Sequence, residues 1–136
     1  MRSLSILFTA CDVLTLMARY SGMAQPAEKT LVGYLVDKGC AAAIMKSPKE
    51  KIESKAQRHT RECNIDEACS AEGYGLIVGD TLYFLDDAGN HLALTYCKSI
   101  NQKDNILVTV TGTVRGEILA VESIKKKIAA SKKYKG

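Results

Sequence analysis

The hydrophobic and polar positions of the chain define five stretches rich in β-branched and aromatic residues, which predict β-strands. These stretches cover residues 30–36, 75–78, 81–85, 106–114 and 118–124. The second and third flank Gly79 and Asp80, a two-residue turn typical of a tight hairpin. The last two are separated only by a turn at residues 115–117. The pattern therefore predicts a mainly β domain over residues 30–124.

A different pattern separates the first two strands, because residues 41–72 are rich in Ala, Lys and Glu. Ser47, Pro48 and Glu50 form a typical helix start, with Ser as the N-cap, Pro at the first helical position and Glu three residues after the cap. We predict a helix from there to about Arg61. Its apolar stripe is thin, so this helical insertion must rest on the domain or be tied to it.

A second helix is predicted between the third and fourth strands. Leu92, Tyr96 and Ile100 recur at helical spacing, although Leu92, Leu94 and Tyr96 also alternate as in a strand. The resulting order is strand, helical insertion, two strands, helix and two strands, which is the plan of a five-stranded OB-like barrel. An open antiparallel sheet with a covering helix is the alternative.

The first 24 residues have the features of a secretory signal peptide. Arg2 supplies a short positive region, and residues 4–17 are mostly apolar. Gly22 and Ala24 place small residues at the −3 and −1 positions of a cleavage site. We therefore expect cleavage near Ala24 and a periplasmic or secreted mature protein.

The alternative to this cleavage is a lipoprotein anchored through Cys11, because residues 8–11 loosely resemble a lipobox. No apolar run of about 20 residues follows residue 25, so we expect no transmembrane segment in the mature chain. Residues 25–29 are predicted to form a linker between the signal peptide and the domain.

Length and charge place further limits on the mature protein. With 136 residues in all, the chain is long enough for one domain. Six lysines lie within residues 125–136, which we expect to form a basic disordered tail. Residues 25–124 hold 11 basic and 14 acidic residues. This acidic balance, together with export, argues against a nucleic-acid partner.

Cleavage near Ala24 leaves an even number of cysteines, which in a short exported chain indicates disulfides. The four candidates are Cys40, Cys63, Cys69 and Cys97. Their spacing allows three pairings and does not choose among them. Cysteines lie before the predicted helix of the insertion and at its end, where a disulfide would tether it to the domain.

The same segment offers an alternative chemistry, which is metal binding. His59 and Cys63 are four residues apart, so they share one face of the predicted helix. Cys40 and Cys69 flank that helix and would complete a set of three thiolates and one imidazole. Zinc accepts such a tetrahedral set, and copper(I) accepts its thiolates. Copper or zinc is the cofactor under this alternative, and otherwise no cofactor is expected.

Several short motifs follow one another in a distinctive order along residues 30–124. They are Gly33-Tyr34-Leu35-Val36-Asp37, Cys40, His59-Thr60, Cys63, Cys69, Gly73-Tyr74-Gly75, the strand 108–114 and Val121-Glu122-Ser123-Ile124. This order resembles that of small exported bacterial proteins that carry an OB-like domain and have no assigned biochemical activity. The resemblance implies an OB-like fold and an exported location, and Cys97 departs from its pattern.

The sequence lacks the motifs of common enzyme classes, such as a nucleophile elbow, a P-loop, a zinc-protease helix or a dinucleotide fingerprint. We therefore expect no enzymatic activity and interpret the chain as a binding or interaction module for an unidentified extracytoplasmic ligand or protein. Because OB-like barrels bind ligands on aromatic platforms, Tyr34, Tyr74 and Tyr83 are candidates for stacking on that ligand. A periplasmic copper- or zinc-binding protein is the alternative function.

Overall fold

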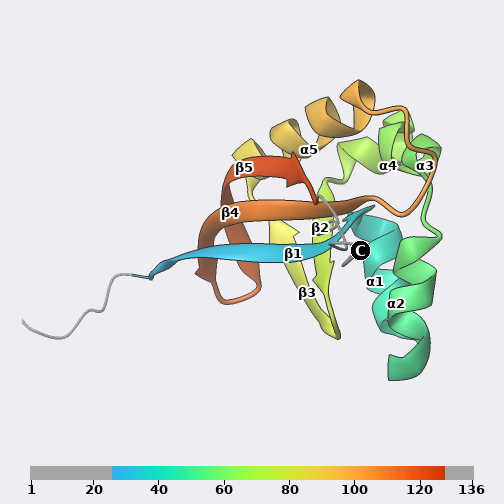
Figure 1. Cartoon of the computed structure of the whole chain (residues 1–136), viewed down its shortest axis with the longest axis horizontal. Coiled ribbons are helices and arrows are strands. Elements are labelled where there is room, and N and C mark those ends of the chain that lie inside the picture. Colours follow the sequence, from blue (N-terminus) through green and yellow to red (C-terminus); the bar gives the residue numbers. More distant parts are fainter. Residues whose placement is uncertain (1–25, 128–136) are drawn as a thin grey trace, which may run out of the picture.

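The computed structural model describes residues 26–127, and Figure 1 shows how its strands and helices are arranged. The predicted signal peptide, residues 1–24, lies outside the described residues, and so does Cys11. Most of the predicted basic tail lies outside them as well. Lys125 and Lys126 are described, and they belong to the last strand rather than to a tail.

Five β-strands form one mixed sheet in the described part of the chain. They are β1 (Glu28–Asp37), β2 (Tyr74–Val78), β3 (Thr81–Leu85), β4 (Leu107–Arg115) and β5 (Ile118–Lys126). The hydrogen-bonded order is β1-β2-β3-β5-β4, and β4 pairs again with β1, so the strands close into a ring. Every pair is antiparallel except β3 with β5, which is parallel. The predicted mainly β fold is confirmed, whereas the alternative of an open antiparallel sheet is wrong.

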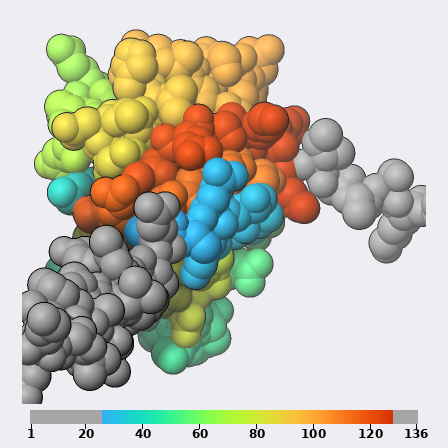
Figure 2. All heavy atoms as spheres, turned by 90° about the vertical axis from the view of Figure 1, so that its left-hand side faces the viewer, coloured from blue at the N-terminus to red at the C-terminus, as the bar shows by residue number. Residues whose placement is uncertain are grey.

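Helices occupy two of the connections between strands. Between β1 and β2 lie α1 (Lys38–Met45), α2 (Lys49–Gln57), α3 (Arg61–Ile65) and α4 (Glu67–Ala71), and between β3 and β4 lies α5 (Asp87–Ser99). In Figure 2, α5 lies along one side of the strands and the far end of α2 lies on the opposite side. None of the helices within residues 26–127 combines the length and the apolar character that crossing a membrane requires.

The helical insertion differs from the single helix predicted over residues 48–61. α2 ends at Gln57, and Thr60 begins α3 as an N-cap whose side chain accepts a hydrogen bond from the Cys63 N–H. Thr60 has an extended backbone, with φ −93° and ψ 150°, which interrupts the helix. His59 therefore lies in the link between two helices and does not share a helical face with Cys63.

Capping explains other shifts at the ends of elements. Pro48, not Ser47, is the N-cap of α2, and Ser47 Oγ instead accepts a hydrogen bond from Lys55 Nζ at 2.7 Å. α5 begins earlier than predicted, because Asp86 caps it by accepting a hydrogen bond from the Gly89 N–H. β1 likewise begins inside the linker that was predicted before it.

Two clusters of buried side chains hold the fold together. The larger contains residues from all five strands and from α5, among them Leu35, Leu76, Leu85, Cys97, Val108, Val110 and Leu119. The smaller packs α1 and α2 against β1 and β2, and it consists of Val36, Ala41, Ile44, Ile52, Ala56 and Ile77. Neighbouring residues of β1 and β2 belong to different clusters because successive side chains of a strand point to opposite faces. The insertion therefore rests on the outer face of the sheet through a small apolar contact.

Candidate functional site

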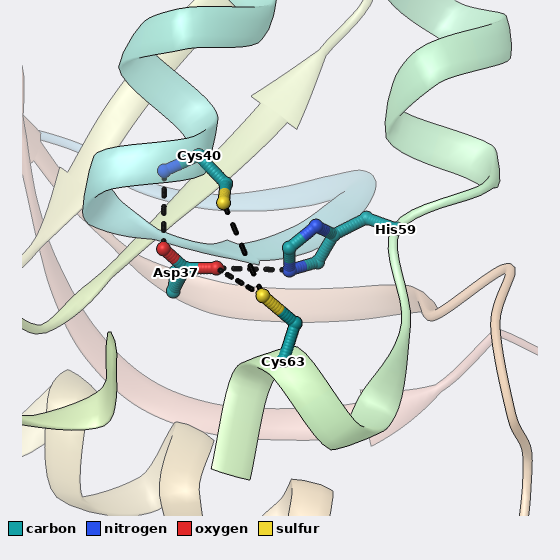
Figure 3. Close-up of side chains that lie close together, drawn as sticks. All are labelled: Asp37, Cys40, His59 and Cys63. Atoms are coloured by element: carbon teal, nitrogen blue, oxygen red, sulfur yellow. Dashed lines mark hydrogen bonds and ion pairs between the residues drawn. The ribbon is translucent and has the colours of Figure 1, made fainter. Parts of the chain in front are cut away.

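Four side chains with metal-binding donor atoms meet where β1 leads into the helical insertion (Figure 3). Asp37 is the last residue of β1, Cys40 lies in the first turn of α1, and Cys63 lies in α3. His59 comes from the link between α2 and α3. One donor atom from each residue lies within 4.8 Å of the others. The site therefore joins the end of the sheet to the insertion.

Asp37 makes the central contacts of the site. Its Oδ2 atom lies 2.9 Å from His59 Nε2 and 3.7 Å from Cys63 Sγ. Its other oxygen, Oδ1, accepts a hydrogen bond from the Cys40 N–H at 3.0 Å and so caps α1. The Sγ atoms of Cys40 and Cys63 are 4.0 Å apart. Oδ1 thus caps α1, and Oδ2 faces the donor atoms of His59 and Cys63.

Asn64 is a fully buried polar residue beside these four side chains. Its Oδ1 accepts a hydrogen bond from the Asp37 N–H at 2.8 Å, and its Nδ2 donates to the Leu35 carbonyl at 2.9 Å. These two backbone groups fix the orientation of the side-chain amide, because an N–H only donates and a carbonyl only accepts. Asn64 therefore connects the site rigidly to the end of β1.

The orientation of Asn64 also fixes a hydrogen on His59. The Nε2 atom of His59 faces two acceptors, Asn64 Oδ1 and Asp37 Oδ2, each at 2.9 Å. Nε2 therefore carries a hydrogen that it donates to this pair. A metal ion bound at Nε2 would replace that hydrogen, so the site can exchange a proton for a metal at this atom.

Burial and neighbouring groups shift the pKa values of the site. Burial alone would raise the pKa of Asp37, but the hydrogen bonds from His59 and from the Cys40 N–H outweigh it and hold this pKa below its usual value. Burial, with Cys40 and Asp37 nearby, raises the pKa of the Cys63 thiol to about 11. Burial and Asp37 also raise the pKa of Cys40. Both thiols are therefore protonated near neutral pH, which argues against a reactive thiolate.

The site is shielded without being closed. Asp37 is 2% exposed, and the His59 side chain is 9% exposed. Cys40 and Cys63 are half-buried. A pocket of about 340 Å³ opens onto Cys40 and His59, so a small ion or molecule can reach these side chains from solvent.

The structure brings together three of the four residues predicted as metal ligands. Cys40, His59 and Cys63 belong to the site. Cys69, in α4, is not among the four, but its thiol lies near the site, since Asp37 and Cys63 add to the effect of burial in raising its pKa. Asp37 occupies the fourth position and was not predicted as a ligand, because in the sequence it is an acidic residue directly after the first predicted strand. Its spacing to Cys40 contained a signal, since an Asp that caps a helix lies beside the first turn of that helix.

The four cysteines within residues 26–127 are free thiols. The 4.0 Å between the sulfurs of Cys40 and Cys63 is well above the S–S bond length of about 2.05 Å. Cys97 is fully buried in the larger core cluster, where its sulfur lies 3.7 Å from Asn64 Nδ2. It therefore packs as a small apolar residue.

The three tyrosines predicted to stack on a ligand lie in different environments. Tyr74 is 1% exposed, and its hydroxyl donates a hydrogen bond to the Asn64 carbonyl. Its ring is not available to a ligand, so the prediction is wrong for Tyr74. Tyr34 and Tyr83 are half-buried, and Tyr34 lines a second pocket of about 290 Å³ together with Glu53.

Comparisons with known proteins gave no match. No family model matches the chain, and neither a curated protein nor a solved structure is significantly similar to it. Function is therefore inferred from the site and the fold.

Proposed function

We propose that this chain is an exported OB-like domain that binds one zinc ion at the site described above. The ligands are Asp37, Cys40, His59 and Cys63. The observation that carries the proposal is the gathering of their four donor atoms within 4.8 Å of one another. These atoms are two sulfurs, one ring nitrogen and one carboxylate oxygen. Zinc binds donors of all three kinds, and its structural sites use four protein ligands in a tetrahedral arrangement.

Two distances between donor atoms agree with this geometry, and a third is shorter. Two sulfurs bound to a tetrahedral zinc ion are about 3.8 Å apart, and a sulfur and a carboxylate oxygen are about 3.6 Å apart. The corresponding distances are 4.0 Å between Cys40 and Cys63 and 3.7 Å between Cys63 and Asp37. The 2.9 Å contact between Asp37 and His59 is a hydrogen bond, which would lengthen to about 3.4 Å when zinc replaces the hydrogen.

The oxygen ligand favours zinc over copper(I). Copper(I) prefers soft sulfur ligands, whereas zinc accepts sulfur, nitrogen and oxygen together. Four protein ligands also leave no open position on a tetrahedral ion, which suits a binding module better than an enzyme. Zinc in this site would tie the end of β1 to α1 and α3 and so anchor the insertion.

Two further observations support the OB-like and exported parts of the proposal. The strand order β1-β2-β3-β5-β4, with α5 between β3 and β4, agrees with the plan of an OB-like barrel. The signal-peptide features of residues 1–24 support export, as does the resemblance to small exported bacterial proteins.

A disulfide between Cys40 and Cys63 is a second candidate, favoured by the 4.0 Å approach of their sulfurs. An oxidising compartment promotes such a bond. Closing the separation of 23 residues would stabilise the fold by about 3 kcal/mol in the loop-entropy account. The two candidates exclude each other, because a disulfide removes both thiolate ligands of the metal.

Intact mass spectrometry of protein recovered from its export compartment separates the two candidates. A native mass raised by one zinc ion, with thiols that alkylate after denaturation without a reductant, supports the zinc site. A denatured mass lower by about 2 Da, with alkylation only after reduction, indicates the disulfide and overturns the zinc proposal.

Variants then test the ligand set, with zinc affinity measured by competition with a chromophoric chelator. We expect Asp37→Asn and Cys63→Ser to weaken zinc binding at least tenfold, and Cys69→Ser to leave it unchanged. Asn still caps a helix, so Asp37→Asn removes the ligand without removing the cap of α1. Loss of zinc binding in Cys69→Ser, with retention in Asp37→Asn, would instead assign the set of three cysteines and one histidine.

A further inference from the structure

The pocket that opens over the metal-binding site is lined by both charged and apolar residues. Its volume is about 340 Å³, and its lining residues are Cys40, Ala43, Ile44, Lys55, Arg58 and His59. Two of these residues, Cys40 and His59, are ligands in the proposed zinc site. Of the other four, two come from α1, Lys55 comes from α2, and Arg58 is the residue that follows α2. These four decide what kind of molecule fits beside the metal.

Two cations, Lys55 and Arg58, line this pocket, and no carboxylate in the described part of the chain pairs with them. Within residues 26–127, no carboxylate oxygen lies within 4.0 Å of either side chain. Lys55 Nζ donates one hydrogen bond to Ser47 Oγ at 2.7 Å and has two further hydrogens to donate. Arg58 Nε donates to the Ser54 carbonyl at 3.2 Å, which leaves its terminal N–H groups for another acceptor. An anion in the pocket would accept from both residues.

The part of the pocket formed by α1 is apolar, since Ala43 and Ile44 lie there. An alkyl group packed on these side chains would be removed from water, which is favourable. Phosphate and sulfate have no apolar part and would gain nothing from this surface. The combination of two cations with an apolar wall therefore favours an organic carboxylate, and the volume leaves room for its alkyl chain.

The charges around the pocket favour a ligand with a single negative charge. Zinc bound by two thiolates and one carboxylate carries a net charge of −1, and the two cations of the pocket bring the sum to +1. Without metal, Lys55 and Arg58 remain the two cations that a carboxylate would meet in the pocket. One carboxylate would neutralise the zinc-bound assembly.

We propose that this pocket binds a small aliphatic monocarboxylate. Its carboxylate pairs with Lys55 and Arg58, and its alkyl chain packs on Ala43 and Ile44. The inference extends the proposed function, because the ligand lies beside the zinc site, but the binding of the ligand does not require the metal.

Titration of the reduced full chain with butyrate, followed by amide NMR with and without zinc, tests the proposal. We expect saturable shifts at the amides of Ala43, Ile44 and His59 in both states. Butyramide has the same shape without the charge and should bind at least tenfold more weakly. Inorganic phosphate should also bind more weakly. Equal binding of butyramide or phosphate, shifts confined to other parts of the fold, or the absence of saturation would overturn the proposal.

Variants that remove the charge of Lys55 or Arg58 test where the carboxylate binds. We expect Lys55→Gln and Arg58→Gln each to weaken butyrate binding about fivefold, the effect of losing roughly 1 kcal/mol of ion pairing. Lys51→Gln is the matched control, because Lys51 is an exposed residue of α2 that does not line the pocket. An equal loss in all three variants would indicate a general charge effect and overturn the assigned site.

Titration with and without zinc distinguishes failure of this inference from failure of the proposed function. If butyrate saturates the pocket but zinc does not bind, the metal proposal fails and the carboxylate site stands. If zinc binds but butyrate does not, only the carboxylate site fails.

Discussion

Asp37 connects helix capping to the chemistry of the site through its two carboxylate oxygens. Oδ1 accepts from the Cys40 N–H, and Oδ2 accepts from His59 Nε2. Because these hydrogen bonds outweigh the effect of burial, the pKa of Asp37 is lower in the folded chain than in the unfolded chain. Its contribution to stability is therefore complete above a pH of about 4 and is lost as the pH falls through the folded value.

The variant Asp37→Asn tests this linkage. It cannot ionise, so the part of the acid-induced destabilisation that Asp37 causes should disappear, and stability below pH 4 should fall less steeply than in the wild type. Urea denaturation of both chains between about pH 2 and 6, in the presence of a chelator, measures the difference. Identical pH dependence in the two chains would show that Asp37 does not have the lowered pKa.

Asn64 supplies the second residue-scale prediction, because its side chain holds two buried backbone groups. In Asn64→Ala, the Asp37 N–H and the Leu35 carbonyl both lose their partner. We expect the free energy of unfolding of the metal-free chain to fall by about 3 kcal/mol, from two unsatisfied groups and a small cavity. Asn101→Ala, at an exposed position, should change it by less than about 0.5 kcal/mol. Similar effects of the two substitutions would contradict the role assigned to Asn64.

The residues of the site differ in how far the sequence could predict them. Cys40, His59 and Cys63 were predicted from residue type, because thiols and imidazoles are the usual ligands of zinc. Asp37 is one of many acidic residues, and only the fold shows that its side chain turns toward the thiols. Cys69 was included for its residue type, and its thiol does lie near Cys63, but it is not within 4.8 Å of every donor atom in the group of four.

At the scale of elements, the break between α2 and α3 decides the geometry of the site. Residue spacing predicted one helix that carries both His59 and Cys63. The structure has two helices, because Thr60 adopts an extended backbone and caps the second one. Such a break depends on the competition between continuing a helix and starting a new one, and local sequence does not settle that competition. The strands were easier to predict, because their β-branched and aromatic residues form continuous stretches, several of them bounded by turn residues.

The variant Thr60→Ala tests the importance of this cap. Loss of the hydrogen bond that the Cys63 N–H donates to the Thr60 hydroxyl oxygen should destabilise the chain by about 1 kcal/mol. Zinc affinity should fall as well, because α3 carries the ligand Cys63. Thr60→Ser retains the hydroxyl and should restore both properties, as measured by urea denaturation and chelator competition. If Thr60→Ser were as damaged as Thr60→Ala, the hydroxyl would not be the cause.

At the scale of the whole molecule, the site lies between two parts of the chain that differ in how much apolar surface they bury. The strands and α5 share the larger core cluster, whereas α1 and α2 rest on the sheet through six buried residues. The insertion therefore has less apolar contact per residue and should open more readily than the ring of strands. Zinc bound by Asp37, Cys40, His59 and Cys63 would link the helical insertion to the sheet.

Hydrogen exchange of the reduced chain tests this division. Without zinc, we expect the amides of α1 and α2 to exchange faster than those of β4, whose inner side chains Val108 and Val110 are fully buried. With free zinc at about 100 times its Kd, an opening that releases the metal is suppressed about a hundredfold. Slowing should therefore be largest in α1 and α3, which carry ligands. The slowing of exchange in β4 should be equally large only if the amides of β4 exchange through global unfolding, which also releases the metal. Slowing confined to β4 would mean that zinc binds elsewhere, because a metal held by α1 and α3 must protect the helices that supply its ligands.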